Sequence, residues 1–329
     1  MTNIRKILQD RILVLDGAMG TMLQRFNFSE EDFRGKQFKD FPHPLKGNND
    51  LLSITQPDAV KSVHREYFKA GADIVETNTF SGTTIGMADY HLEDYVYELN
   101  FQSAKIAREV ADEFIDKPRF VAGSIGPTNR TASMSPDVNN PGFRAITFDE
   151  LRLAYKQQVE ALIDGGCDLL LVETIFDTLN AKAALFAIEE VKENRNIDIP
   201  VMVSGTITDA SGRTLSGQTV EAFLISISHI PLLSVGFNCA LGADQLKPYL
   251  KTLGQNTNLN ISAHPNAGLP NAFGKYDQTP EEMQQLIREY LKENLVNIIG
   301  GCCGTTPEHI KLIAEVAQEF QPRKKELQV

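Results

Sequence analysis

The chain has 329 residues, of which 42% are hydrophobic and 23% charged, and its formal net charge is −11. This length allows one large core or two domains, and the acidic balance argues against a nucleic acid as the main partner. Residues 1–10 lack the apolar core of a signal peptide, and no apolar run approaches the roughly 18 residues of a membrane span. We therefore expect a cytoplasmic protein with no nucleic-acid and no membrane partner.

Short apolar segments alternate with helical ones along the whole chain. The predicted strands cover residues 11–16, 73–77, 119–126, 168–174, 200–206, 234–239, 260–266 and 296–300. Helices are predicted near Thr21 and over residues 57–70, 92–114, 149–164, 177–194, 219–228, 243–253, 280–292 and 307–320. Because parallel strands need long crossover connections, this alternation indicates an α/β fold with a parallel sheet. Eight strands favour closure into a (β/α)8 TIM-type barrel, although an open doubly wound sheet shows the same alternation.

No break in composition marks a second domain. We expect a single barrel over residues 1–320, followed by a charged tail over residues 321–329 that looks like the start of an interdomain linker. Long polar loops are predicted at residues 127–148, after the third strand, and at residues 208–218, after the fifth. In an α/β barrel such loops lie at the C-terminal face, where active sites are built.

Two adjacent cysteines, Cys302 and Cys303, follow the eighth predicted strand and are flanked by glycines. Neighbouring side chains of a strand point to opposite faces, so both cysteines can serve one site only where the backbone bends. Gly300, Gly301 and Gly304 permit that bend, because glycine reaches conformations that other residues avoid. A disulfide between neighbours is disfavoured, since their Cα atoms lie about 3.8 Å apart and disulfides prefer about 4.4–6.8 Å. The pair is better suited to holding one metal ion.

Polar residues end most of the predicted strands, and in a barrel they would meet at one mouth. They are Asp16 and Gly17 after the first strand, Thr77 and Asn78 after the second, Glu173 in the fourth, Asn238 and Cys239 in the sixth, His264, Pro265 and Asn266 in the seventh, and the cysteine pair after the eighth. Cys239 can therefore join the pair. Three thiolates favour zinc and leave one of its four positions open, which is the pattern of a catalytic zinc site. Cys167 precedes the fourth strand and is expected at the opposite end, as a small buried residue.

Each of these residues also has a purely structural interpretation. The cysteines can be separate core residues, since free cysteine is often buried. Asp16 can cap a helix, and Glu173 can form an ion pair at a strand end, where a buried acid needs a cationic partner. His264 can be a hydrogen-bonded loop histidine.

Five blocks of the sequence resemble the homocysteine S-methyltransferase family. They are residues 12–24 (ILVLDGAMGTMLQ), 73–80 (DIVETNTF), 205–218 (GTITDASGRTLSGQ), 263–273 (AHPNAGLPNAF) and 300–307 (GGCCGTTP). Their order and length are most similar to the N-terminal homocysteine-binding module of cobalamin-dependent methionine synthases. The resemblance implies a (β/α)8 barrel with zinc held by Cys239, Cys302 and Cys303. It also implies that the homocysteine sulfur takes the open position on the metal.

The same resemblance assigns roles to the other residues at the mouth. Asp16 and Glu173 would bind the ammonium group of homocysteine, and Gly17 and Thr77 its carboxylate, close to Phe80. Asn238 would support the substrate site beside Cys239. Asn266 is a candidate for the fourth zinc ligand when substrate is absent.

The resemblance implies that a zinc thiolate of homocysteine attacks the methyl group of methylcobalamin and gives methionine. This chain contains no Asp-x-His-x-x-Gly run, the pattern expected around a cobalamin-ligating histidine. Methylcobalamin would therefore be carried by another module or chain, and cobalamin-binding and folate-binding modules are the expected partners. One alternative is a self-sufficient transferase that uses a small donor, S-methylmethionine or betaine. A second is a non-catalytic zinc-binding module.

Overall fold

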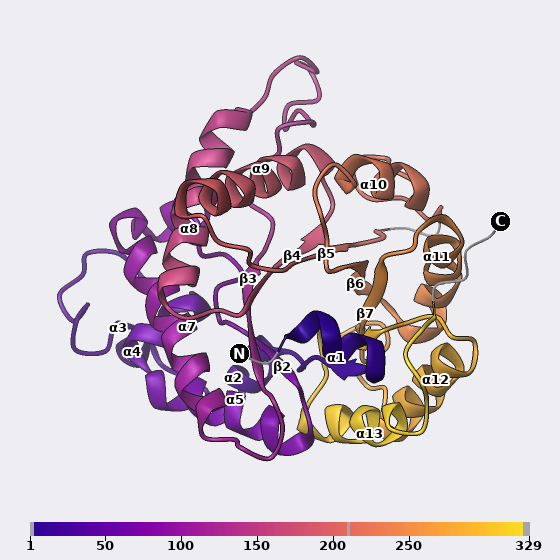
Figure 1. The fold of residues 1–329 in the computed structure, drawn as a ribbon. Helices are drawn as coiled ribbons and strands as arrows, with labels where there is room; N and C mark the ends of the chain where they lie inside the picture. Colours follow the sequence, from indigo (N-terminus) through magenta and orange to yellow (C-terminus); the bar gives the residue numbers. More distant parts are fainter. Residues whose placement is uncertain (1–2, 209–210, 325–329) are drawn as a thin grey trace.

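The computed structural model describes residues 3–208 and 211–324. Within them, eight parallel strands form a ring that helices surround (Figure 1). The strands are β1 (Leu13–Val14), β2 (Ile74–Glu76), β3 (Phe120–Ile125), β4 (Leu169–Ile175), β5 (Val201–Gly205), β6 (Ser234–Gly242), β7 (Asn260–Asn266) and β8 (Ile298–Ile299). All eight predicted strands are present, and β1, β2 and β8 are shorter than the sequence predicts.

The ring closes between its first two strands. The hydrogen-bonded order is β1-β8-β7-β6-β5-β4-β3-β2, and the neighbouring strands are parallel. A parallel bridge joins Leu15 to Ile74, where the Asp16 N–H donates to the Ile74 carbonyl over 3.0 Å. The predicted (β/α)8 TIM-type barrel is therefore confirmed, and the open doubly wound alternative is wrong.

Helices occupy the connections between the strands. They are α1 (Ile4–Asp10), α2 (Met19–Gln24), α3 (Glu30–Arg34), α4 (Leu52–Thr55), α5 (Pro57–Ala70), α6 (Thr84–Met87), α7 (Val96–Asp112), α8 (Phe148–Asp164), α9 (Thr178–Arg195), α10 (Val220–Ile227), α11 (Ala243–Asn256), α12 (Pro280–Lys292) and α13 (Pro307–Ala317), with 3-10 turns at Asn49–Leu51, Ala88–Tyr90 and Glu93–Tyr95. The long predicted helices agree with these, and α5 and α12 have the predicted bounds. The segment before α8 projects beyond the ring at the top of Figure 1.

Side chains on the strands alternate between two apolar clusters, as the pleat of a strand requires. In β5, Val203 belongs to the cluster under the helices, whereas Met202 belongs to the cluster inside the barrel. The inner cluster also contains Ile4 and Leu8 of α1, which lies across the near end of the barrel in Figure 1. The sequence analysis missed α1, because seven residues are too few to show a clear helical period.

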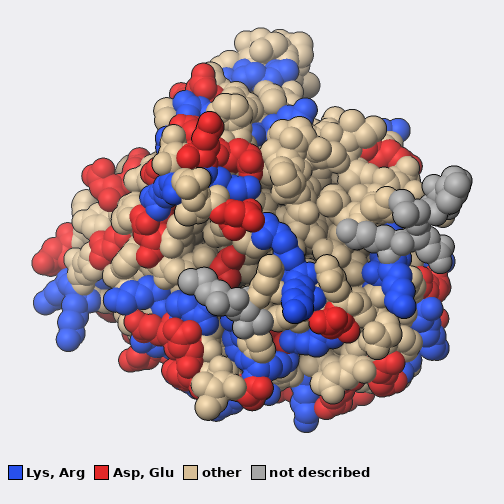
Figure 2. All heavy atoms as spheres, in the orientation of Figure 1, with Lys and Arg blue, Asp and Glu red and all other residues tan. Residues whose placement is uncertain are grey.

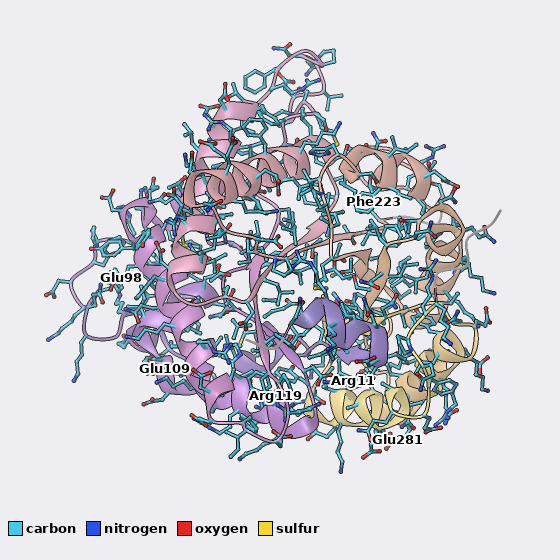
Figure 3. All side chains as sticks on the ribbon, viewed as in Figure 1. Arg11, Glu98, Glu109, Arg119, Phe223 and Glu281 are labelled. Carbon is cyan, nitrogen blue, oxygen red and sulfur yellow. The ribbon has the colours of Figure 1, made fainter. Side chains whose placement is uncertain are left out.

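Contacts at the strand starts and under the helices hold the barrel together (Figure 3). Arg11 makes two hydrogen bonds to the carboxylate of Asp73, at 2.8 and 2.9 Å, next to the seam between β1 and β2. On the outer side, the Phe223 ring of α10 packs 5.5 Å from the Phe237 ring of β6. Gly205 of β5 makes room for this contact, since a Cβ at that position would lie 2.8 Å from the Phe223 ring.

The end of the barrel that faces the viewer carries interspersed acidic and basic side chains (Figure 2). Among the described residues, no helix has both the length and the apolar character that crossing a membrane requires. In the expected tail, Arg323 packs against the barrel and donates to the carbonyls of Gly254, Thr257 and Leu259. Residues 325–329 lie outside the described part of the chain, so the interdomain linker stays a prediction.

Candidate functional site

The C-terminal ends of β6 and β8 bring three cysteines together at the barrel mouth. The sulfur atoms of Cys239, Cys302 and Cys303 all lie within 4.8 Å of one another, and those of Cys239 and Cys303 are 3.8 Å apart. All four cysteines are free thiols, and Cys167 is not part of this group. The interpretation of the three cysteines as separate core residues is therefore wrong.

A break in the regular pairing of β6 places Cys239. The register between β6 and β7 shifts after Asn238 and resumes at Gly242. Cys239 and Ala240 have φ angles of 60° and 56°, in the left-handed region that residues other than glycine rarely adopt. Such local strain is often found at functional sites, and here it turns the Cys239 sulfur toward the other two cysteines.

Hydrogen bonds to the end of β7 hold the two adjacent cysteines. The Cys302 N–H donates to the Pro265 carbonyl over 2.9 Å, and the Cys303 carbonyl accepts from the Ala267 N–H over 2.9 Å. Both cysteines can face one site because the chain leaves the strand at this point, as predicted. Gly304 has a φ of 80°, a conformation that glycine adopts without steric cost.

The sulfur spacing fits a metal ion. Zinc binds thiolates at about 2.3 Å, so two sulfurs at tetrahedral positions lie about 3.8 Å apart. The distance of 3.8 Å between Cys239 and Cys303 matches this value. Hydrogen bonds from the Cys239 and Cys302 thiols lower the pKa of Cys303 to about 3. Hydrogen bonding to Cys239 and Cys303 raises the pKa of Cys302.

Tyr276 lies against this group, and the sequence analysis missed it. It belongs to the hairpin between β7 and α12, where an antiparallel bridge pairs it with Pro270. Its ring packs against Gly304, and burial, together with the nearby charge of Cys303, raises the pKa of the Tyr276 hydroxyl. The sequence offers no signal for this contact, because a hairpin at the mouth can turn in many directions.

Three buried carboxyl groups and one half-buried carboxyl group lie on the same side of the barrel as the cysteines. Asp16, Asp50 and Glu173 are 2%, 6% and 5% exposed, and Glu76 is partly covered. Burial raises the pKa of all four, and the charge of Glu173 raises that of Asp16, Glu76 and Asp50 further. Among the described residues, no Lys or Arg pairs with any of them. The ion-pair interpretation of Glu173 is therefore wrong, and the group as it stands lacks a cation.

The two predicted acids are held by different partners. Asp16 accepts from the Glu76 N–H over 3.1 Å through Oδ2, whereas its buried Oδ1 has no partner. Asp16 does not cap α2, whose N-cap residue is Ala18, so that interpretation is wrong. Glu173 accepts from the Ser124 hydroxyl over 2.5 Å through Oε1.

Asn238 connects the acidic group to the cysteines. Its Nδ2 lies 3.3 Å from Glu173 Oε2 and 3.9 Å from Cys302 Sγ. Its Oδ1 accepts from the Ser204 hydroxyl over 2.6 Å and from the Thr174 N–H over 3.0 Å. Because these two donors fix the amide orientation, the NH2 group must face the acid and the sulfur.

The other predicted substrate residues surround this group. Gly17 has no room for a side chain, since a Cβ would lie 2.6 Å from the Thr305 hydroxyl. The Thr77 hydroxyl accepts from the Ser124 N–H and hydrogen-bonds to Thr79 over 2.6 Å. Phe80 is 41% exposed at the rim. Their contacts with a substrate stay predictions.

The end of β7 carries two more buried polar side chains. Asn266 Oδ1 is buried without a hydrogen-bond partner. This is consistent with a role as a metal ligand. His264 is 2% exposed, and neither ring nitrogen has a partner. The interpretation of His264 as a hydrogen-bonded loop histidine is therefore wrong. Burial lowers its pKa to about 3, so the imidazole is neutral.

A closed (β/α)8 barrel with three grouped cysteines at its mouth defines a class of protein that can hold a metal ion next to a group of acidic side chains. A family model described as homocysteine S-methyltransferase matches residues 13–317. The chain belongs to the homocysteine S-methyltransferase family.

Solved structures of the homocysteine methyltransferase MmuM from Escherichia coli have the same fold. The metallated form has a TM-score of 0.72 at 23% identity, with 95% of this chain and 98% of that chain covered. The oxidized form has a TM-score of 0.70 at 23% identity, with 92% and 95% covered. The apo form has a TM-score of 0.68 at 21% identity, with 95% and 98% covered.

Proposed function

We propose that this chain is a zinc-dependent homocysteine S-methyltransferase module whose methyl donor is methylcobalamin carried by another module or chain. One observation carries the proposal, namely the three sulfurs within 4.8 Å of one another beside a buried acidic group at the barrel mouth. The sulfurs are suited to a metal that activates a thiol, and the acids to the ammonium group of the same substrate. The family assignment supports methyl transfer to homocysteine.

Cys239, Cys302 and Cys303 would hold the zinc, and Asn266 would be the fourth ligand without substrate. The metal, when bound, would favour the thiolate form of homocysteine, which is the nucleophilic form of a thiol. The side chains of the protein would orient the bound substrate. Asn238, fixed by Ser204 and Thr174, keeps its amide between the acid and the sulfur groups.

The acidic group would bind the substrate ammonium. Asp16 Oδ1 is buried and unpaired, and an unpaired buried carboxylate is costly until a cation arrives. Burial raises the pKa of Glu76 and of Glu173, and the charge of Glu173 raises the pKa of Glu76 further. An ammonium group bound beside them would offset that repulsion. Gly17 and Thr77, near Phe80, would bind the substrate carboxylate.

Zinc-edge X-ray absorption of the zinc-loaded protein tests the proposal. We expect the number of sulfur atoms at zinc to rise from three to four when homocysteine is added, and to stay at three with methionine. A fixed count of three would exclude thiol activation. A zinc ion with four protein ligands, whose coordination does not change when homocysteine is added, would identify a non-catalytic zinc-binding module.

The donor needs its own experiment. The barrel covers 98% of the Escherichia coli homocysteine methyltransferase chain, which favours a self-sufficient enzyme with S-methylmethionine or betaine as the second candidate. Incubation with homocysteine and each methyl donor distinguishes the two candidate functions. Methionine formed from free methylcobalamin supports the module, whereas turnover with a small donor alone supports the second candidate. A cobalamin-binding partner would dock on the loops at residues 127–148 and 208–218.

A further inference from the structure

A groove lies at the N-terminal end of the barrel, opposite the cysteines. Its volume is about 510 Å³, within the roughly 300–1,000 Å³ of sites that bind small molecules. The groove runs between α1, which crosses this end of the barrel in Figure 1, and the segments where β6, β7 and β8 begin. None of the grouped cysteines or of the acids beside them lines it, so it is separate from the site at the mouth.

The lining of this groove is cationic, although the chain as a whole has a formal net charge of −11. Arg5, Arg323 and Lys324 contribute to it, whereas no described Asp or Glu does. Arg5 pairs with Asp198 over 3.1 Å, and this pair is weak because both side chains are exposed. Arg323 and Lys324 form no ion pair within the described part of the chain. Two of the three cations are therefore available to an anionic ligand.

Arg323 is held in place without a carboxylate. Its guanidinium donates to the carbonyls of Gly254, Thr257 and Leu259 over 2.8, 3.1 and 3.1 Å. Its own carbonyl accepts from Asn297 Nδ2 over 2.9 Å. Burial lowers the pKa of Arg323, since part of its hydration is lost. The carbonyl dipoles orient this side chain but leave its formal charge in place, which favours an anion as the ligand.

The apolar part of the groove consists of leucines. Leu8 and Leu233 are buried, and Leu232 and Leu259 are partly exposed. Among the described lining residues there is no aromatic ring, so a flat ring system would find no stacking partner. The guanidinium of Arg323 uses three of its five N–H donors on carbonyls. The two that remain suit the two oxygens of a carboxylate better than the three of a phosphate ester.

We propose that this groove binds an aliphatic carboxylate that carries no ammonium group. The carboxylate lies at Arg323 and Lys324, and the aliphatic chain lies along Leu232 and Leu259. An ammonium group would face three cations and no acid, so homocysteine and methionine are excluded from the groove. The mouth has the opposite character, with its group of buried acids. The inference goes beyond the proposed function and does not depend on it.

Isothermal titration calorimetry of the full chain with octanoate tests the inference, with 2-aminooctanoate and 1-octanol as comparison ligands. We expect octanoate to bind at a single site, at least about tenfold more tightly than either comparison ligand. The first of these adds an ammonium group, and the second lacks the negative charge. Saturating homocysteine should leave the octanoate affinity unchanged. Displacement of octanoate by homocysteine would place it at the mouth and overturn the inference.

Two charge-reversal variants locate the binding site. The exposed Lys324 side chain makes no hydrogen bond or ion pair with the rest of the described structure, so Lys324→Glu should fold normally. We expect Lys324→Glu to weaken octanoate binding about tenfold, because it places a carboxylate beside that of the ligand. The matched control is Lys6→Glu, which follows Arg5 on α1 but does not line the groove and should bind octanoate as the wild type does.

The outcomes separate this inference from the proposed function. Equal octanoate affinity of the wild type and Lys324→Glu, equal affinity for octanoate and 2-aminooctanoate, or no saturable octanoate binding would each overturn the inference. A wild type that binds octanoate as expected but does not bind zinc or homocysteine would overturn the proposed function alone, because the groove shares no residue with the mouth.

Discussion

Asn238 donates to Glu173, with 3.3 Å between Nδ2 and Oε2, and it stands directly before the metal-ligand candidate Cys239. One amide thus joins the acidic group to the cysteine group. The same side chain accepts from Ser204 and Thr174, so both of its ends are occupied.

Replacing this amide should weaken substrate binding and stability together. In Asn238→Ala the Ser204 hydroxyl and Thr174 N–H lose their acceptor, and we expect the free energy of unfolding to fall by about 1–3 kcal/mol. Homocysteine affinity, measured by calorimetry, should fall about tenfold, since Glu173 loses a donor that orients it. An affinity equal to the wild type would remove Asn238 from the substrate site.

Glu76 should contribute to ammonium binding, although the sequence analysis did not single it out. In Glu76→Gln the pocket loses one carboxylate, and we expect homocysteine affinity to fall on the order of 10–100-fold while zinc content stays unchanged. Glu98→Gln is the matched control, because Glu98 lies on the surface of α7 (Figure 3). If both variants bind homocysteine alike, Glu76 is not part of the pocket.

The three grouped cysteines should be separable from the fourth by metal analysis. We expect Cys239→Ser, Cys302→Ser and Cys303→Ser each to weaken zinc binding by at least about 100-fold, since even second-sphere changes cost 10–100-fold. Cys167→Ser should keep the wild-type zinc content, because Cys167 lies outside the group. Zinc retention by any of the first three variants would contradict the proposed ligand set.

The buried acids make stability depend on pH in an unusual direction. Burial raises the pKa of Asp50 from 3.8 to about 7, so the folded state holds a proton that the unfolded state releases. Stability should therefore fall as the pH rises from about 4 to 7, by at most about 4 kcal/mol from this group.

Urea unfolding of the metal-free protein at several pH values checks this prediction. The decrease in unfolding free energy with rising pH should be smaller in Asp50→Asn, which keeps an acceptor for the Ser81 N–H but cannot ionise. Asp94→Asn, at an exposed position, should follow the wild-type profile. Parallel profiles for all three proteins would mean that Asp50 is not protonated at neutral pH.

The long loop after β3 should depend on one buried amide. Asn180 of α9 accepts from the Ala132 N–H over 2.9 Å and donates to the Arg130 carbonyl over 2.8 Å and to the Thr128 hydroxyl over 3.2 Å. In Asn180→Ala we expect faster hydrogen exchange over residues 128–134 and slower methyl transfer from a cobalamin-carrying partner. Homocysteine affinity should not change, and an equal loss of both properties would argue against a separate docking role.

The barrel and the grouping of the three cysteines could both be predicted from the sequence. Apolar segments of the right length marked all eight strands, and Asp16, Glu173, Asn238 and the three cysteines stand where strands end. Their meeting point follows from parallel pairing alone, because all C-terminal strand ends lie on one face.

Other site residues depend on contacts that no local pattern encodes. Glu76 could have been found, since it is an acid at an inward position of an apolar strand, as Glu173 is. Asp50 comes from an irregular polar segment, and Tyr276 from a hairpin held by Asn271. Their positions are set by tertiary hydrogen bonds, which a single sequence does not display.

The position of Cys302 and Cys303 after the last strand fixes the order in which the site can be assembled during synthesis. Cys302 and Cys303 follow the last strand, which pairs with the first one. Just beyond that strand, the Gly301 N–H donates to the Asp16 carbonyl over 3.1 Å. A ribosome-bound chain that has emerged only through β6 contains one of the three grouped cysteines, Cys239, and an open ring. A metal ion held by all three cysteines would therefore bind only after nearly the whole barrel has left the ribosome, and it would tie the end of β6 to the segment that follows β8.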